Sequence, residues 1–497
     1  MLVTVPAHAA WMEASSNHFV IYADAKETWI RAFAEKLESV DAGIRTLMSL
    51  GNPESERSNR LRIYVVNNEA SVQRLCGKSC KNVSGFYTPR AGGSIVFTPK
   101  RTDGGDVFDE DVVLFHEYGH HMLFRNWAAA YPAWYTEGFA EFVSTATVGK
   151  DKRVTIGAAA QHRAYSLFNY TMPVSDLLEK GVQFGKNGLD NDALYGRGWL
   201  LTHYLTMENA RAGQLGRYLG LLNAGTPSLK AAMQAFGDLK ALDRDLNSYL
   251  RRSRISVFAL PAKMLTVGEI RVRPLSAGAG AIMPTRMRSD RGVNEVEAAE
   301  VVKEARRIAD AFPTDSFVQS VLAEAEYDVG NLDAADAAAD RAIAADPKNA
   351  DAFIYKGLVA HRRATAAHAD AAVWKAARGW YIKANRIDTG NAKAPFLFYN
   401  SFYTAGVEPT PNAVDGLLAA FQLAPEDPEL RYAAAYELLR RKEGSTAKAV
   451  LSVLAFDPHR PPSKRLQSAL SLIDAGKLDD ASAALRSTAD AGEENEG

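Results

Sequence analysis

Two histidines four residues apart, with a glutamate directly after the first, are the feature that most restricts how this chain can fold. His116, Glu117 and His120 belong to the run His-Glu-Tyr-Gly-His. Residues four apart on a helix lie on the same face, so both imidazoles can reach one metal ion. The acidic residues at 109–111 suit the first turn of such a helix because they complement its dipole. The pattern therefore predicts a helix that carries two metal ligands.

A second run, Trp134 to Glu141, supplies carboxylates. We predict that Glu137 is the third ligand and that Glu141, one helical turn later, accepts a hydrogen bond from a ligand imidazole, more readily from His116. Two imidazoles and a carboxylate, with a fourth position left to water, make a catalytic Zn²⁺ site. Glu117 need not bind metal and can take a proton from the activated water and pass it to a leaving amine. The alternative is a surface helix with coincidental histidines.

These residues resemble the gluzincin branch of the metallopeptidases, which contains thermolysin and the M1 aminopeptidases. The HExxH…E pattern of that branch is matched by His116, Glu117, His120 and Glu137. Residues 134–140 are similar to the Trp-Leu-x-Glu-Gly-Phe-Ala segment of the M1 enzymes. The resemblance implies an α+β zincin-like metallopeptidase domain with a small mixed sheet, the HExxH helix and a helical lower half. It is closest to small bacterial peptidase MA-like proteins, which join such a domain to tetratricopeptide repeats.

A tyrosine further along the chain is a candidate for stabilising the transition state. The run 195–198, Tyr-Gly-Arg-Gly, resembles the Tyr-Glu-Lys-Gly segment of the M1 enzymes, in which the tyrosine hydrogen-bonds the developing oxyanion. The resemblance implies that Tyr195 has this catalytic role. The alternative is a buried aromatic residue at a helix start. His121 points about 100° away from His120 on a helix, so we expect it beside the site or on the surface.

We predict that residues 15–253 form the gluzincin-like zinc peptidase domain. Apolar residues at helical spacing predict a long helix over 27–50. Alternating and β-branched residues predict strands at 18–24, 61–66, 86–87 and 94–97. The last strand has no acidic residue where the M1 enzymes carry a glutamate for the substrate's amine, so the resemblance does not extend to aminopeptidase specificity. Glycine-rich loops are predicted near 181–198.

The rest of the chain has a different character. Residues 254–290 are predicted to form an extended β-linker, with a turn at 277–280. From 291 to 497 the chain is rich in alanine, and a phrase ending in Asp-Pro or its equivalent recurs at 313, 347, 389, 425 and 458. A period near 34 residues resembles tetratricopeptide repeats and predicts an all-α solenoid whose concave surface docks a peptide or protein partner. The alternative is an irregular alanine-rich helical domain.

Composition and the chain start restrict the location and the partners. The chain has 58 basic and 59 acidic residues, so no basic surplus favours nucleic acid. No apolar run approaches the roughly 20 residues of a membrane helix. Residues 1–14 contain an Ala-x-Ala pattern and are predicted to be a signal-peptide remnant or flexible tail, which favours a periplasmic or secreted protein over a cytoplasmic one. Cys76 and Cys80 could form a disulfide there or stay reduced.

The leading hypothesis is a zinc-dependent peptidase that uses metal-activated water and docks substrate or a partner protein on its repeats. One alternative is an M48-type envelope protease, but the third ligand of that type lies much further downstream than Glu137. Another is a non-catalytic repeat scaffold with a vestigial or structural zinc domain. Glu117 favours catalysis, because a structural site has no use for a general base.

Overall fold

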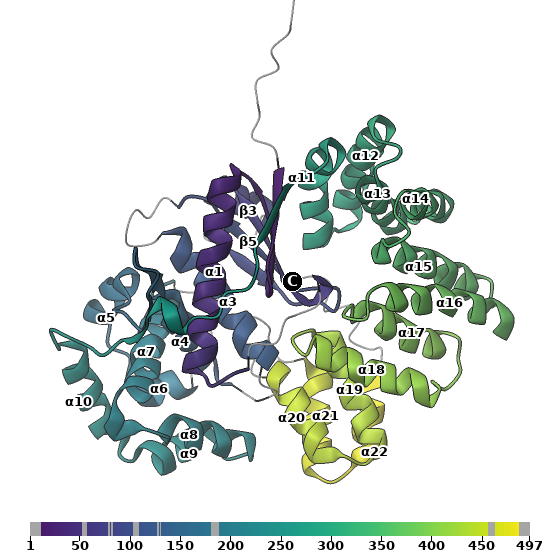
Figure 1. Cartoon of the computed structure of the whole chain (residues 1–497). Helices are drawn as coiled ribbons and strands as arrows, with labels where there is room; N and C mark the ends of the chain where they lie inside the picture. The colour runs from purple at the N-terminus through teal and green to yellow at the C-terminus, as the bar shows by residue number, and fades with distance from the viewer. Residues whose placement is uncertain are drawn as a thin grey trace, which may run out of the picture. The chain divides into compact units, whose positions relative to one another are not determined.

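The computed structural model describes residues 11–51, 57–77, 80, 83–102, 109–126, 129, 131–179, 188–455 and 463–486 (Figure 1). The chain divides into two compact units, each assembled from three segments. Unit 1 contains residues 1–38, 53–100 and 268–424, and unit 2 contains residues 39–52, 101–267 and 425–497. Each unit thus combines segments from both sides of the domain boundaries predicted at 253 and 290.

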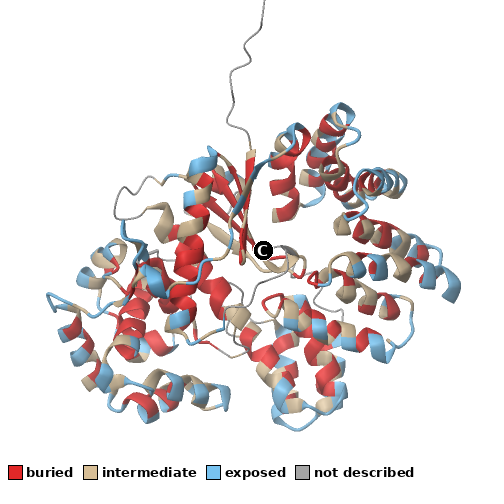
Figure 2. Ribbon diagram, in the orientation of Figure 1, coloured by how far each residue is buried: buried red, intermediate tan, exposed pale blue. Residues whose placement is uncertain are grey.

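In the described part of unit 1, a mixed six-stranded sheet has the order β4-β5-β3-β2-β1-β9. The strands are β1 (Trp11–Ser15), β2 (Phe19–Asp24), β3 (Leu61–Val66), β4 (Phe86–Thr88), β5 (Ile95–Pro99) and β9 (Arg271–Pro274). The parallel strands β2, β3 and β5 are almost wholly buried, which explains their apolar and aromatic sequences (Figure 2). Tyr64 stacks between Tyr22 and Phe97, with ring centroids 5.5 and 5.3 Å apart. The four predicted strands are present as β2 to β5.

The predicted N-terminal tail is too long, because residues 11–15 form strand β1 inside the sheet. Its second partner, β9, comes from residues 271–274. Glu13 is buried, and its carboxylate accepts a hydrogen bond from the Arg273 guanidinium at 2.9 Å. Local sequence does not reveal this strand, because the residues that complete it lie far along the chain.

The turn predicted at 277–280 is also wrong, because helix α11 (Ala277–Arg291) begins there. The Ser276 hydroxyl caps the helix by accepting a hydrogen bond from the Ala279 N–H at 3.0 Å. A side chain at Gly278 would lie 3.0 Å from both Phe312 and Val318, so glycine permits close packing here. Tertiary packing therefore overrides the low helix propensity of glycine.

Helix α11 carries a buried group of charges that we name the Asp290 cluster: Arg62, Tyr64, Arg286, Asp290 and Glu324. Asp290 accepts hydrogen bonds from Tyr64 at 2.5 Å, Arg62 at 3.1 Å and Arg286 at 3.0 Å. Arg286 also donates to Glu324 at 2.9 Å. Burial alone would raise the pKa of Asp290, but Arg286 and Arg62 hold it well below its ordinary value. The cluster joins the sheet, α11 and the next helices of unit 1.

An all-α array follows α11 in unit 1 (Figure 1). Its helices are α12 (Glu295–Ala311), α13 (Ser316–Asp328), α14 (Leu332–Ala345), α15 (Ala350–Ala366), α16 (Ala371–Ile387), α17 (Lys393–Thr404) and α18 (Pro411–Leu423). Each helix packs against the next in sequence order. Small residues permit the close packing: on α14, Ala335, Ala338, Ala339 and Ala342 are fully buried. The all-α character predicted for residues 291–497 is confirmed for these helices, but this array ends with α18, because residues 425–497 belong to unit 2.

Unit 2 is largely helical. Its helices are α3 (Glu110–Asn126), α4 (Ala133–Ser144), α5 (Ala164–Asn169), α6 (Val174–Glu179), α7 (Gly188–Met207), α8 (Gln214–Asn223), α9 (Ser228–Phe236), α10 (Leu239–Leu250), α19 (Pro428–Arg440), α20 (Gly444–Ala455), α21 (Lys464–Asp474) and α22 (Leu478–Arg486). A small antiparallel sheet contains β6 (Thr147–Val148), β7 (Val154–Ile156) and β8 (Phe258–Leu260). The helix predicted over 27–50 is α1 (Glu27–Leu47), which contributes to both units.

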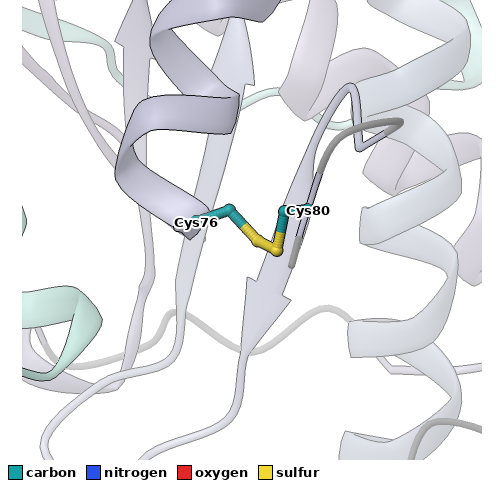
Figure 3. The surroundings of a disulfide bond; sticks show 2 residues. All are labelled: Cys76 and Cys80. Carbon is teal, nitrogen blue, oxygen red and sulfur yellow. A yellow bond between two sulfur atoms is a disulfide. The ribbon is translucent and has the colours of Figure 1, made fainter. Parts of the chain in front are cut away.

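Two further features of the chain are a disulfide and the lengths of its described helices. Cys76, at the end of α2 (Glu69–Cys76), is joined to Cys80 by a disulfide (Figure 3). Within the described residues, no helix combines the length and apolarity needed to cross a membrane. Residues 1–10, where the predicted Ala-x-Ala pattern lies, fall outside the described residues.

Candidate metal centre

Helices α3, α4 and α7 cross closely because glycines lie at the crossings. A Cβ at Gly119 on α3 would lie 2.8 Å from the Cα of Ala140 on α4. A Cβ at Gly198 on α7 would lie 2.6 Å from the carbonyl oxygen of Trp134 on α4, and one at Gly138 would collide with the carbonyl of Gly198. Real side chains do not tolerate such distances. The glycines therefore let side chains from three helices meet in one place.

His116 and His120 on α3 meet Glu137 on α4. The two Nε2 atoms lie 3.2 Å apart, and Glu137 Oε2 lies 3.4 Å from His116 Nε2 and 3.7 Å from His120 Nε2. A tetrahedral zinc site with bonds of about 2.1 Å has about 3.4 Å between neighbouring ligand atoms. The three side chains thus fit a divalent cation with the spacing they already have, and we call them the metal site. The Glu137 side chain is fully buried, whereas 18% of the His116 side chain is exposed. A small molecule can therefore reach the metal site from solvent on the His116 side.

Glu141 lies one turn after Glu137 and touches the far side of His116. Its Oε1 is 3.1 Å from His116 Nδ1, the contact predicted from the sequence. An Nδ1–H that donates to Glu141 leaves the Nε2 lone pair for a cation. Burial lowers the pKa of His116, but the two carboxylates outweigh burial and raise it to about 10. A cation that bound here would therefore displace a proton from His116, as is usual for metal binding at histidine.

His162 and Arg163, which no sequence motif indicates, complete the surroundings of Glu141. His162 Nε2 lies 2.6 Å from Glu141 Oε2, and Arg163 Nη2 donates to Oε1 at 2.6 Å. Arg163 Nη1 also donates to Asp192 on α7 at 2.6 Å, and its guanidinium lies 4.9 Å from the centre of the Tyr195 ring. Burial raises the pKa of Glu141, but Arg163 and the imidazoles outweigh it and hold the pKa well below its ordinary value. No motif spacing connects these residues, so only the packing of α5 and α7 reveals them.

Tyr195 lies within α7, not at a helix start, because α7 already begins at Gly188. The loops predicted near 181–198 are thus helical from 188, and residues 181–187 fall outside the described residues. The Tyr195 ring centroid lies 6.2 Å from that of His116. Burial and the charge of Glu137 raise the pKa of Tyr195, so the phenol stays protonated and can donate a hydrogen bond.

Two remaining residues of the HExxH helix differ in exposure. Glu117 is half-buried, and its charge contributes to the raised pKa of Tyr195. His121 is buried and stacks on Tyr118 with ring centroids 5.9 Å apart, so it does not lie on the surface. The metal site, Glu117 and Tyr195 thus lie near one another in unit 2, whereas His121 belongs to the core.

Comparisons with known proteins do not assign a family. No protein-family model matches the chain, and no curated protein matches it. One similar solved structure is TTC0263, a thermophilic TPR protein of Thermus thermophilus, with 16% identity over 40% of this chain and 100% of that chain and a TM-score of 0.32. Another is MamA MSR-1 C2, with 20% identity over 37% of this chain and 89% of that chain and a TM-score of 0.23. Likenesses of this strength support no conclusion about function.

Proposed function

We propose that this protein is a zinc-dependent peptidase of the gluzincin type. The observation that supports this proposal best is the convergence of two imidazole nitrogens and one carboxylate oxygen within 3.7 Å of one another. Nitrogen and oxygen donors in this number are typical of catalytic zinc, which leaves one coordination position for water. Glu117, next in sequence to a ligand and half-exposed, provides the carboxylate that hydrolysis needs.

The proposed chemistry divides between the metal and the chain. A divalent cation held by His116, His120 and Glu137 would supply Lewis acidity toward water and a carbonyl oxygen. Glu117 would take a proton from the attacking water and transfer it to the leaving amine. The protonated phenol of Tyr195 would donate a hydrogen bond to the carbonyl oxygen as negative charge develops there.

The repeat array and the disulfide extend this proposal. We propose that the all-α array docks a protein or peptide, as substrate or as partner, because stacked helix pairs present an extended surface. We also propose export to the periplasm or out of the cell. The Cys76–Cys80 disulfide supports export, since disulfides persist mainly in oxidising compartments.

A second candidate function is a non-catalytic repeat scaffold. The observation that favours it is the array α12 to α18, which needs no metal to bind a partner. In this case the metal site would only stabilise unit 2. Support for hydrolysis comes from the site geometry alone, so the two candidates need a direct test.

The test compares wild-type protein with Glu117→Gln, measuring zinc content and the cleavage of a generic unfolded protein. We expect both proteins to bind zinc and the variant to lose about 10²–10⁴-fold in rate, the usual contribution of a general base. Glu110→Gln, in the first turn of the same helix, is the matched control and should cleave normally. If wild-type protein binds zinc but cleaves nothing, the scaffold function is supported instead.

A further inference from the structure

We infer that Arg163 is a positioning residue that holds the metal ligand His116 and the catalytic candidate Tyr195 in one fixed geometry. This inference rests on the proposed function, because it assigns a role at the same site. Arg163 directly precedes α5, and its side chain donates hydrogen bonds to Glu141 on α4 and to Asp192 on α7. Only 18% of the side chain is exposed, so solvent does little to screen or loosen its contacts.

The first contact fixes Glu141. Glu141 Oε1 accepts a hydrogen bond from Arg163 Nη2 at 2.6 Å and also lies 3.1 Å from His116 Nδ1. Its Oε2 faces His162 Nε2 at 2.6 Å. The carboxylate is therefore held at both oxygens, and its plane sets the direction in which the His116 ring points. Among the described residues, removal of Arg163 would leave His162 as the one contact that holds the carboxylate apart from the His116 ring, so the carboxylate and the ring would be less firmly oriented.

The second and third contacts fix α7. Arg163 Nη1 donates to Asp192 Oδ1 at 2.6 Å, and Asp192 lies one helical turn before Tyr195. The guanidinium also lies 4.9 Å from the Tyr195 ring centre, within the range of a cation–π contact. Arginine can hold two carboxylates and stack on a ring at once because its guanidinium is planar with five N–H donors, whereas lysine offers a single charged point.

These contacts predict two separable effects of substitution. Loss of the Glu141 contact loosens His116 and weakens metal binding, because groups that orient a metal ligand typically contribute 10–100-fold in affinity. Loss of the Asp192 contact loosens only α7 and its Tyr195, and leaves the contact between Arg163 and Glu141 in place. Asp192→Asn should therefore leave metal affinity within about 3-fold of wild type. At saturating metal it should lower kcat about 10-fold with little change in KM, the pattern of an interaction made only in the transition state.

The experiment measures zinc affinity of the full chain by competition with a chromogenic chelator, which requires no catalysis. We expect Arg163→Gln to bind zinc about 10–100-fold more weakly. Arg163→Lys should bind zinc more tightly than Arg163→Gln but more weakly than wild-type protein. Its zinc affinity also provides the test if Arg163→Gln does not fold. Arg197→Gln is the matched control: the Arg197 side chain on α7 is 8% exposed, against 18% for Arg163, and donates to Asp243 and Asn247 instead of to Glu141 or Asp192. Its substitution should lower stability but not zinc affinity.

The possible results separate the inference from the proposed function. Unchanged zinc affinity in both Arg163 variants would overturn the positioning role while leaving the proposed function intact. An equal loss of zinc affinity in Arg197→Gln would also overturn it, because the loss would then reflect general destabilisation. Failure of the wild-type protein to bind zinc at all would instead reject the proposed function itself.

Discussion

The Asp290 cluster of unit 1 and the metal site of unit 2 are both buried and charged, yet they are composed in opposite ways. Around Asp290, two guanidiniums and a phenol donate to the carboxylate, so positive and negative groups alternate. In the metal site, two imidazole nitrogens and a carboxylate oxygen point at one another. Lone pairs that face each other repel unless a proton or a cation lies between them.

The difference shows how a structural charge cluster can be told from a candidate site. In the Asp290 cluster, each acceptor meets donors from the chain itself, so the cluster is complete as it stands. In the metal site, two imidazoles and a carboxylate converge instead, a set of groups that is typical of a divalent cation site. Burial alone does not distinguish the two, because Asp290 and Glu137 are both almost inaccessible.

The largest change in the free energy of unfolding should come from a substitution that removes the central carboxylate of the Asp290 cluster. Asp290→Ala leaves Arg62 and Arg286 buried without their shared carboxylate, and we expect a loss of about 3–5 kcal/mol in the free energy of unfolding. Urea denaturation measures it. Glu304→Ala removes the partner of Arg307 on an exposed surface, where water screens the pair, and should lower the free energy of unfolding far less. Equal losses in the two variants would show that the Asp290 cluster is solvated and does not hold unit 1 together.

Metal addition should stabilise the protein by a smaller amount. Zinc at about 100 times its Kd should add about 2.7 kcal/mol to the free energy of unfolding, because it binds the folded state. Denaturation with and without a chelator measures the increment. His116→Ala should abolish it, whereas Asp290→Ala should retain it. A full increment in His116→Ala would mean that zinc binds elsewhere.

The crossing of α4 and α7 should tolerate no side chain. A Cβ at Gly138 would lie 2.6 Å from Thr202 Oγ1 and would also meet the Gly198 carbonyl, so Gly138→Ala should cost about 1–3 kcal/mol. Gly216→Ala is the control, because nothing lies within 4 Å of a Cβ there on exposed α8. That change should stabilise by up to about 1 kcal/mol through helix propensity. Thermal unfolding of both variants would contradict the packing argument if Gly138→Ala were neutral.

The smallest effect concerns His203, a buried histidine that the chain satisfies by itself. Its Nε2–H donates to the Gly157 carbonyl at 2.8 Å, and its Nδ1 accepts from the Tyr249 hydroxyl at 2.9 Å. Burial lowers the pKa of His203, so the unfolded chain takes up a proton first as pH falls. Its contribution is present above the unfolded pKa of about 6.5 and is lost as pH falls toward the lower folded pKa.

The measurement for His203 is the difference in unfolding free energy between wild-type protein and His203→Gln at pH 7.5 and pH 5. This difference should shrink at the lower pH, because only the wild-type protein loses the contribution of the neutral imidazole. A difference that grows toward pH 5 would mean that the folded state prefers the charged imidazole, against the donor and acceptor roles described above.

Residues whose relation is local could be predicted from the sequence. His116 and His120 share a helix face because of their spacing, and Glu137 and Glu141 do so for the same reason. The strands 61–66 and 94–97 stand out because buried parallel strands are continuously apolar. The zinc cofactor, the catalytic roles and the zincin-like fold of the first domain stay predictions, supported by geometry alone.

Relations that depend on distant packing could not be predicted. Strand β1 is stabilised by β9, and the residues that pair the two strands are more than 250 positions apart. Arg163 lies outside any motif, and its contacts exist only because α5 packs on α7. The start of α11 has the composition of a turn, and its helix depends on the neighbours that surround Gly278. In each case the deciding partner is remote in sequence.

The three-segment composition of each unit has a consequence for how the protein is made and dissected. The chain passes from one unit to the other after residues 38, 52, 100, 267 and 424. During synthesis, unit 2 is complete only after its last segment, residues 425–497, has been translated. The HExxH helix can pack on α4 early, but its contact with Arg431, which donates to the Phe124 carbonyl, forms about 300 codons later. A single truncation of the gene would therefore not yield either unit intact, because each unit needs three separate segments. Both units should be produced by expressing the full-length chain.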